Sequence, residues 1–189
     1  KTSANFYLNK MINFYKERID SKSMTLIKKL KITFKNKKNN LRLFTTFTHG
    51  DFAKYNSIKN KSKFYIIFFE KFRERIILYD QINWVSHSIL YNLSKIFSLM
   101  KFKKLKKIFL LFCEKYILII FFIFRYIFNY KIFTFNEFKT YFIFFILEKY
   151  LICKNDYYKI NNKNEKKYIK NLIYLSEIIL SKLISHQLK

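Results

Sequence analysis

Residues 45–56 read TTFTHGDFAKYN and contain the feature that most constrains the fold of this chain. The stretch from Leu43 to Thr48 is rich in β-branched and aromatic residues, which predicts a short strand. Gly50, the only glycine in a chain of 189 residues without proline, follows the strand almost at once. Because glycine lets the backbone bend where a Cβ would obstruct, we predict a strand that runs into a sharp loop.

The loop carries two polar groups with complementary chemistry, Asp51 and Asn56. Phosphoryl transfer needs a carboxylate that orients the acceptor hydroxyl and takes its proton. It also needs oxygen ligands that hold Mg²⁺ on the nucleotide phosphates. A carboxylate and an amide at this spacing fit both tasks when the loop between them folds back. The residues therefore indicate a candidate phosphotransfer site.

A β-hairpin is predicted after the loop. The polar stretch from Lys59 to Ser62 is typical of a turn, and Lys63 to Phe69 has the composition of a strand. The next residues, Glu70 to Arg75, are charged and predict a loop.

Apolar residues at helical spacing predict helices over most of the remaining chain. The expected helices are Asn5–Ile19, Met24–Phe34, Tyr79–Met100, Ile108–Phe128, Asn136–Cys153 and Lys167–Leu188, with Asn136 as an N-cap and a polar loop over Asn155–Lys167. The sequence thus predicts one mainly α domain with a small β-hairpin (α+β). It divides into a helical lead-in over residues 1–40, the loop and hairpin over 41–80, and a helical subdomain over 81–189.

The loop His49-Gly50-Asp51-Phe52-Ala53-Lys54-Tyr55-Asn56 resembles that of the aminoglycoside phosphotransferase and choline kinase-like family, whose bacterial members carry His-Gly-Asp-Phe-x-Pro-Trp-Asn. Lys54 stands where the family has proline. The segment from Leu78 to Val85 is similar to the family's Tyr-Asp-Leu-x-x-Phe segment, whose aspartate supports the catalytic loop. The resemblance implies the C-terminal lobe of a protein-kinase-like fold.

The resemblance also implies roles for single residues. Asp51 would be the catalytic base, Asn56 a metal ligand, and His49, Gly50 and Asp80 would support the loop. The implied cofactors are ATP and Mg²⁺, and the implied substrate is a small molecule with a hydroxyl group, such as a sugar, an aminoglycoside or an amino alcohol.

Two departures from the family predict a fragmentary or degenerate enzyme. The family's second metal-binding residue, an aspartate, is replaced by Phe68, which cannot coordinate a hard cation. Glu70 lies two residues further on and could compensate only if the backbone moved. Residues 1–48 also contain no glycine and leave no room for a nucleotide-binding N-terminal lobe. We therefore expect that lobe to be absent and expect little or no kinase activity from this chain alone.

The net charge of +26 supports an alternative interpretation. Such a charge is typical of proteins that bind nucleic acid, so a non-catalytic RNA-binding or organellar ribosomal protein is a second hypothesis. The lysines, however, run through every segment, and the abundance of Lys, Asn, Ile and Phe over Gly, Pro and Ala indicates an A/T-rich genome. The charge can therefore reflect codon usage.

A membrane-associated helical protein is the third hypothesis, because Ile108 to Phe128 is strongly apolar. Glu114, Lys115 and Arg125 interrupt this stretch, so we expect a buried helix without a transmembrane span. The start of the chain lacks a signal peptide, which predicts a cytoplasmic or organelle-matrix protein that is not secreted. Cys113 and Cys153 lie within apolar patterns and are expected to be buried thiols, and His87 is expected to be a helix residue without chemistry.

Overall fold

A computed structural model describes residues 1–36, 42–51, 57–61, 63–66, 72–99, 115–126 and 134–187. Its elements are the helices α1 (Ala4–Phe14), α2 (Ser21–Asn36), α3 (Tyr79–Leu99), α5 (Phe135–Tyr157) and α6 (Lys163–Gln187), a helix over residues 115–126, a 3₁₀ turn (Lys16–Arg18), and the strands β1 (Thr2–Ser3), β2 (Arg42–Leu43), β3 (Thr45–Thr48), β4 (Ser57–Asn60), β5 (Lys63–Ile66) and β6 (Arg73–Ile76). The structure confirms a mainly helical protein with a small antiparallel β content.

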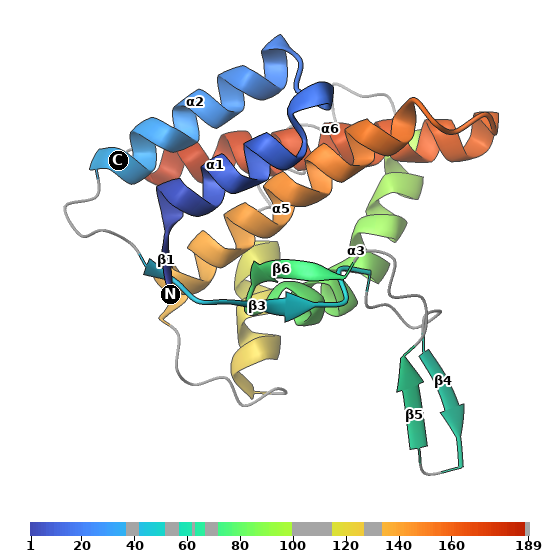
Figure 1. Ribbon diagram of the computed structural model, residues 1–189. Coiled ribbons are helices and arrows are strands. Elements are labelled where there is room, and N and C mark those ends of the chain that lie inside the picture. Colours follow the sequence, from blue (N-terminus) through green and yellow to red (C-terminus); the bar gives the residue numbers. More distant parts are fainter. Residues whose placement is uncertain are drawn as a thin grey trace.

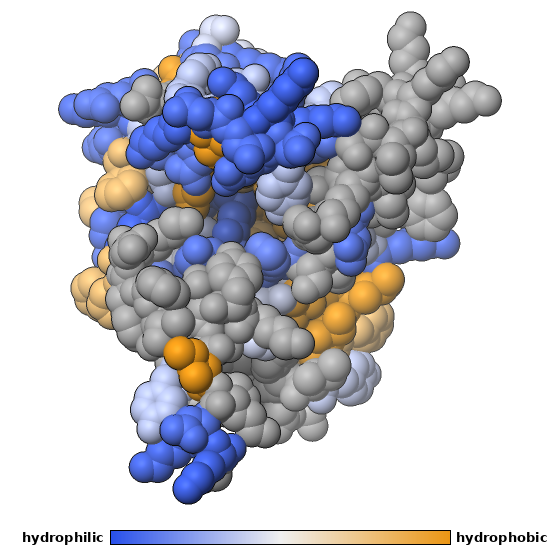
Figure 2. Space-filling model, turned by 90° about the vertical axis from the view of Figure 1, so that its right-hand side faces the viewer, coloured by the Kyte–Doolittle hydropathy of each residue, from blue (hydrophilic) through white to orange (hydrophobic). Residues whose placement is uncertain are grey.

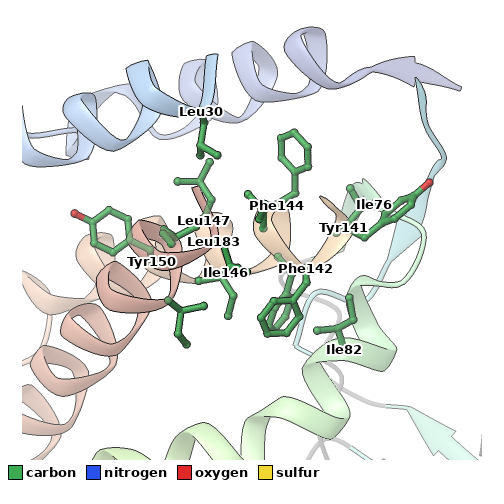
Figure 3. Packing of buried hydrophobic residues seen from close by; sticks show 14 of the residues in the cluster. Leu30, Ile76, Ile82, Tyr141, Phe142, Phe144, Ile146, Leu147, Tyr150 and Leu183 are labelled. Atoms are coloured by element: carbon green, nitrogen blue, oxygen red, sulfur yellow. The ribbon is translucent and has the colours of Figure 1, made fainter. Parts of the chain in front are cut away.

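Helix α5 is the centre of the fold. Its sequence from Tyr141 to Leu147 is apolar without interruption, and all seven residues are buried. A helix that is apolar on all sides must be covered on all sides. Figure 1 shows α1 and α2 packed on one side of α5 and α6 running alongside it, and Figure 3 shows Leu30 of α2 and Leu183 of α6 meeting it from different directions.

Short polar caps fix where the helices begin. The Ser3 hydroxyl accepts a hydrogen bond from the Phe6 amide at 3.1 Å and starts α1. The Asp20 carboxylate accepts one from the Ser23 amide at 2.8 Å at the start of α2. Thr134 caps α5 in a reciprocal capping box with Glu137. Helix α5 therefore begins one residue earlier than the expected Asn136 start, and the prediction of Asn136 as its N-cap is wrong.

The strands form three separate antiparallel pairs: β1 with β2, β3 with β6, and β4 with β5. In the pair that leads to the predicted loop, Thr46 lies opposite Arg75 and Thr48 opposite Arg73. The prediction of a loop over Glu70–Arg75 is therefore wrong from Arg73 onward. Its charged side chains are compatible with a strand because they find partners in the rest of the fold.

The predicted hairpin is present as β4 and β5, with Ser57 opposite Ile66. The prediction of a turn over Lys59–Ser62 is wrong at Lys59 and Asn60, which pair with Phe64 and Lys63. Figure 1 shows it projecting away from the helical body. The expected loop over Asn155–Lys167 is shorter than predicted, since α5 continues to Tyr157 and α6 already begins at Lys163.

Of the expected helix over Ile108–Phe128, the described part is helical from 115 to 126. Its inner side packs on α5, with the Phe121 and Phe138 rings 5.5 Å apart. Leu118, Ile119, Phe122 and Tyr126 are exposed, so the prediction of a buried helix is wrong for its outer face. Within the part of the chain that the structure describes, no helix has the length and apolarity to cross a bilayer. Cys153 is buried, as expected, and Cys113 lies outside the described residues.

Candidate functional site

The predicted loop begins where β3 ends, and its first residues are held within the fold. His49 is buried, Gly50 is buried and Asp51 is half-buried. Gly50 has φ +79°, the left-handed region that favours glycine. The Asp51 amide donates a hydrogen bond to Nδ1 of His49 at 3.3 Å. The backbone therefore turns sharply at Gly50, and Asp51 follows in a bend and not in a helix or strand.

Asp80, in the first turn of α3, fastens this bend to the helical body. Its Oδ2 accepts a hydrogen bond from the His49 amide at 2.7 Å, and its Oδ1 accepts one from the Gly50 amide at 2.8 Å. Hydrogen bonds to an ionised carboxylate are the stronger class. One side chain thus satisfies two successive backbone donors and fixes the direction in which the chain leaves Gly50.

Arg75 of β6 packs against the bend at Gly50. It is 2% exposed, and its Nη1 donates to the Thr48 hydroxyl at 3.3 Å. Its Nε donates to Oε1 of Glu148 at 2.6 Å. Its guanidinium also lies 4.8 Å from the centre of the Tyr79 ring, next to Asp80 in the sequence. Arg75 therefore joins β3, α3 and α5 next to Gly50.

Glu148 is the buried charge on which this arrangement depends. The carboxylate is 1% exposed and pairs with Arg75 and with Arg73. The Tyr7 hydroxyl donates to it at 3.4 Å and accepts a hydrogen bond from the Ile76 amide at 3.3 Å. Burial raises the pKa of Tyr7, and the negative charge of Glu148 raises it further. Tyr7 therefore stays neutral and serves as a donor to the carboxylate.

His87 interacts electrostatically with Asp51 and with Lys149. His87 is half-buried on α3, two helical turns beyond Asp80, and Lys149 lies on α5. Burial lowers the pKa of the His87 imidazole, the Lys149 ammonium also lowers it, and the Asp51 carboxylate raises it, with a net downward shift. His87 lies within α3, as expected.

The structure brings together four of the predicted site residues: His49, Gly50, Asp51 and Asp80. Asn56, Phe68 and Glu70 lie outside the described residues. Among the residues that are described, no group of three or more His, Cys, Asp or Glu side chains could hold a metal ion.

Sequence reasoning missed Arg75 and Glu148. A signal for Glu148 was available, because it is the only acidic residue between Phe138 and Cys153, in a stretch that is otherwise mainly apolar. A lone carboxylate in such a stretch is buried only if it is paired. The identity of its partners, more than 70 residues away in sequence, was not accessible from the pattern.

Comparisons with protein-family models, with curated proteins and with solved structures give no match to this chain.

Proposed function

We propose that this chain is the C-terminal lobe of a kinase-like phosphotransferase similar to the aminoglycoside phosphotransferase and choline kinase-like family, in degenerate form. The observation that carries the proposal is the pair of hydrogen bonds from the His49 and Gly50 amides to the two carboxylate oxygens of Asp80. The resemblance implies such support by the aspartate that opens the helix after the hairpin. A coincidental His-Gly-Asp sequence would give no reason for Asp80 to lie there.

In this proposal Asp51 is the ancestral catalytic base, placed by the bend at Gly50 to take a proton from an acceptor hydroxyl. Asn56 offers one amide oxygen to a metal ion, and Phe68 offers none. This donor set does not fit Mg²⁺, which is coordinated by several oxygen ligands. The acceptor would be a sugar, an aminoglycoside or an amino alcohol. A protein of this lineage would work where ATP is present, in the cytoplasm or an organelle matrix.

We expect little or no phosphotransfer by the chain alone, because positioning of the metal carries much of the catalysis in this reaction class. The assay is release or transfer of the ATP γ-phosphoryl group with candidate hydroxyl acceptors, compared with the Asp51→Asn variant. Equal background signals from both proteins are the expected result. Turnover by the unmodified chain that Asp51→Asn abolishes would show that the site is active and not degenerate.

Restoring the missing carboxylate tests the proposed lineage more sharply. The Phe68→Asp variant should gain Mn²⁺·ATP binding, detected by electron paramagnetic resonance, and Asn56→Ala in the same background should remove the gain. Phe69→Asp is the matched control, since it adds the same charge one position away and should gain nothing. If Phe68→Asp and Phe69→Asp bind Mn²⁺ equally, the correspondence of Phe68 with a metal ligand is wrong.

RNA binding is the second candidate, favoured by the exposed lysines of α2. Lys22, Lys28, Lys29, Lys31 and Lys35 are all exposed along this one helix. Binding through phosphate contacts would weaken with salt, with a slope of about −0.7 per contact for a single strand. Strong binding that survives Asp51→Asn and Asp80→Ala but falls when these lysines become glutamine would favour RNA binding over phosphotransfer.

A further inference from the structure

The helix over residues 115–126 is apolar on its outer face as well as its inner face. Its inner residues Tyr116, Ile117, Ile120, Phe121 and Phe124 are buried against the core. Its outer residues remain exposed: Leu118 at 38%, Ile119 at 54%, Phe122 at 44% and Tyr126 at 71%. The Phe122 and Tyr126 rings stack at 5.9 Å and form one aromatic surface. A helix that is apolar all round is normally covered all round, so this outer face is suited to a partner.

A hollow of about 400 Å³ adjoins this face, a volume within the range of ligand pockets. Its apolar lining comes from Ile117, Leu118, Phe135 and Leu183, and its charged lining consists of Lys115, Lys139 and Lys182. Leu118 belongs to both the hollow and the exposed face. The two features therefore form one surface, here called the helix 115–126 surface, in which aliphatic and aromatic groups lie among ammonium groups.

We propose that the helix 115–126 surface docks on an anionic phospholipid bilayer. Interfacial helices bury an apolar face at the boundary between headgroups and acyl chains, and they use Lys and Arg to contact anionic lipids. Leu118, Ile119 and Phe122 supply the inserted groups, and Tyr126 suits the headgroup level, where amphipathic rings gather. Arg125 on the same helix is exposed and adds a further cation. The hollow has room for part of an acyl chain, with lysines beside its phosphate.

The charge and the apolar groups together favour a bilayer over other occupants. A second copy of the chain would bring +26 against +26, which opposes self-association. RNA would satisfy the lysines, but the exposed aliphatic side chains of Leu118 and Ile119 provide neither stacking nor phosphate contacts. On the face drawn in Figure 2, hydrophilic residues cover much of the described surface and hydrophobic residues gather in separate areas. A general attraction to anions would give no role to the exposed side chains of Leu118, Ile119 and Phe122.

Vesicle co-sedimentation tests the proposal with a matched pair of isoleucines. Vesicles of phosphatidylcholine alone are compared with vesicles of equal parts phosphatidylcholine and phosphatidylglycerol, and binding should require the second composition. Ile119→Ser and Phe122→Ser should each weaken binding by about tenfold, from the loss of one inserted apolar side chain. The control is Ile32→Ser on α2, since Ile32 is 55% exposed and Ile119 54% exposed. Ile32→Ser should leave binding unchanged.

A lysine series tests the charge contribution. Lys139→Gln and Lys182→Gln should each weaken binding by roughly fivefold, and the pair Lys28→Gln and Lys31→Gln on α2 should have a smaller effect. The proposal is overturned if Ile119→Ser and Ile32→Ser behave alike, if both lysine pairs have equal effects, or if Ile119→Ser instead abolishes dimer formation in sedimentation velocity. Circular dichroism of each variant checks that its fold is intact, and none of these readouts depends on phosphotransfer.

Discussion

The guanidinium of Arg75 occupies the space that any side chain at Gly50 would need. An ideal Cβ built on Gly50 would lie 2.6 Å from Nη2 of Arg75. Arg75 cannot withdraw easily, because it is buried and paired with Glu148. Gly50 also has φ +79°, which side chains disfavour. Two independent constraints therefore require glycine at this bend. The contact between Gly50 and Arg75 joins the candidate site to the core.

We predict that Gly50→Ala lowers the free energy of unfolding by about 1–3 kcal/mol or more, from the left-handed backbone and the displaced guanidinium together. Urea denaturation followed by circular dichroism measures it. Lys61→Gly is the opposing control, because Lys61 has φ 53° and glycine would relieve its backbone. A loss at Gly50→Ala no greater than that at Lys61→Gly would mean that the bend is not constrained as described.

Glu148→Gln should be strongly destabilising, by about 3–5 kcal/mol, because it leaves the two arginines without a buried counter-charge. Glu74→Gln is the matched control, since Glu74 also pairs with a cation, Lys10, but both partners are substantially exposed. Exposed pairs of this kind contribute about 0–1 kcal/mol. Equal losses from the two variants in urea denaturation would contradict the central role of Glu148.

The double variant Glu148→Leu with Arg75→Met tests whether the cost of Glu148→Gln comes from leaving a buried charge without its partner. Replacing both members of a buried ion pair by apolar groups costs far less than removing one. The double variant leaves only Arg73 without a counter-charge, and its side chain is 22% exposed. We therefore expect the double variant to be more stable than Glu148→Gln. A loss equal to the sum of the two single changes would show that the residues act independently.

Asp20 should give the protein a measurable dependence on acidic pH. Burial acts to raise the pKa of its carboxyl, but hydrogen bonds from Lys154 and Ser23 outweigh burial and lower the pKa from 3.8 to about 2. A lowered pKa in the folded state stabilises the protein above the ordinary value, and this contribution is lost as pH falls toward about 2. Because the carboxylate is 49% exposed, solvent screening limits the effect to on the order of 1 kcal/mol.

The measurement is the unfolding free energy of the unmodified chain minus that of Asp20→Asn, followed as pH is lowered from neutral. The difference should shrink through the window between 3.8 and about 2. In a Lys154→Gln background the same difference should be smaller at neutral pH, where Asp20 is ionised. A difference that stays constant with pH would rule out the ionised carboxylate as its source.

The N-cap of α5 is Asn136 by the sequence prediction and Thr134 in the structure, and the two assignments can be tested directly. Thr134→Ala should cost about 1 kcal/mol, because it removes the hydroxyl that accepts from the Glu137 amide. Asn136→Ala should have little effect, since Asn136 lies within the helix. Thermal unfolding measures the stability of both variants. A larger loss of stability in Asn136→Ala than in Thr134→Ala would mean that Asn136 is the N-cap after all.

Local sequence signals predicted the parts of the fold that depend on neighbours in the chain. The strand before Gly50, the hairpin around Lys61 and the helix beginning at Tyr79 follow from composition and periodicity, and all are present. The approach of Asp80 to the loop could be anticipated only through the family resemblance. Nothing in the spacing of the residues requires the contact, which spans 30 positions.

Long-range pairing explains most of what was missed. Strand β6 reads RERI, which predicts a loop when considered alone, because its charges have no visible partners. Arg73 and Arg75 become compatible with a strand only through Glu148 on α5. The Asn136 error has a local cause, because Thr134 and Glu137 together form a capping box that a single-residue rule overlooks.

Hydrogen exchange at the His49 and Gly50 amides tests most directly whether Asp80 holds the candidate catalytic loop. In Asp80→Ala both amides should exchange roughly tenfold faster or more, the loss expected for charge-assisted hydrogen bonds, after correction for any change at the amides of α6. Asp80→Asn retains one acceptor oxygen, so its exchange rates at these amides should lie between those of the unmodified chain and those of Asp80→Ala. If both amides exchange in Asp80→Ala at the rate of the unmodified chain, Asp80 does not hold the loop and the kinase-like account of this chain is contradicted.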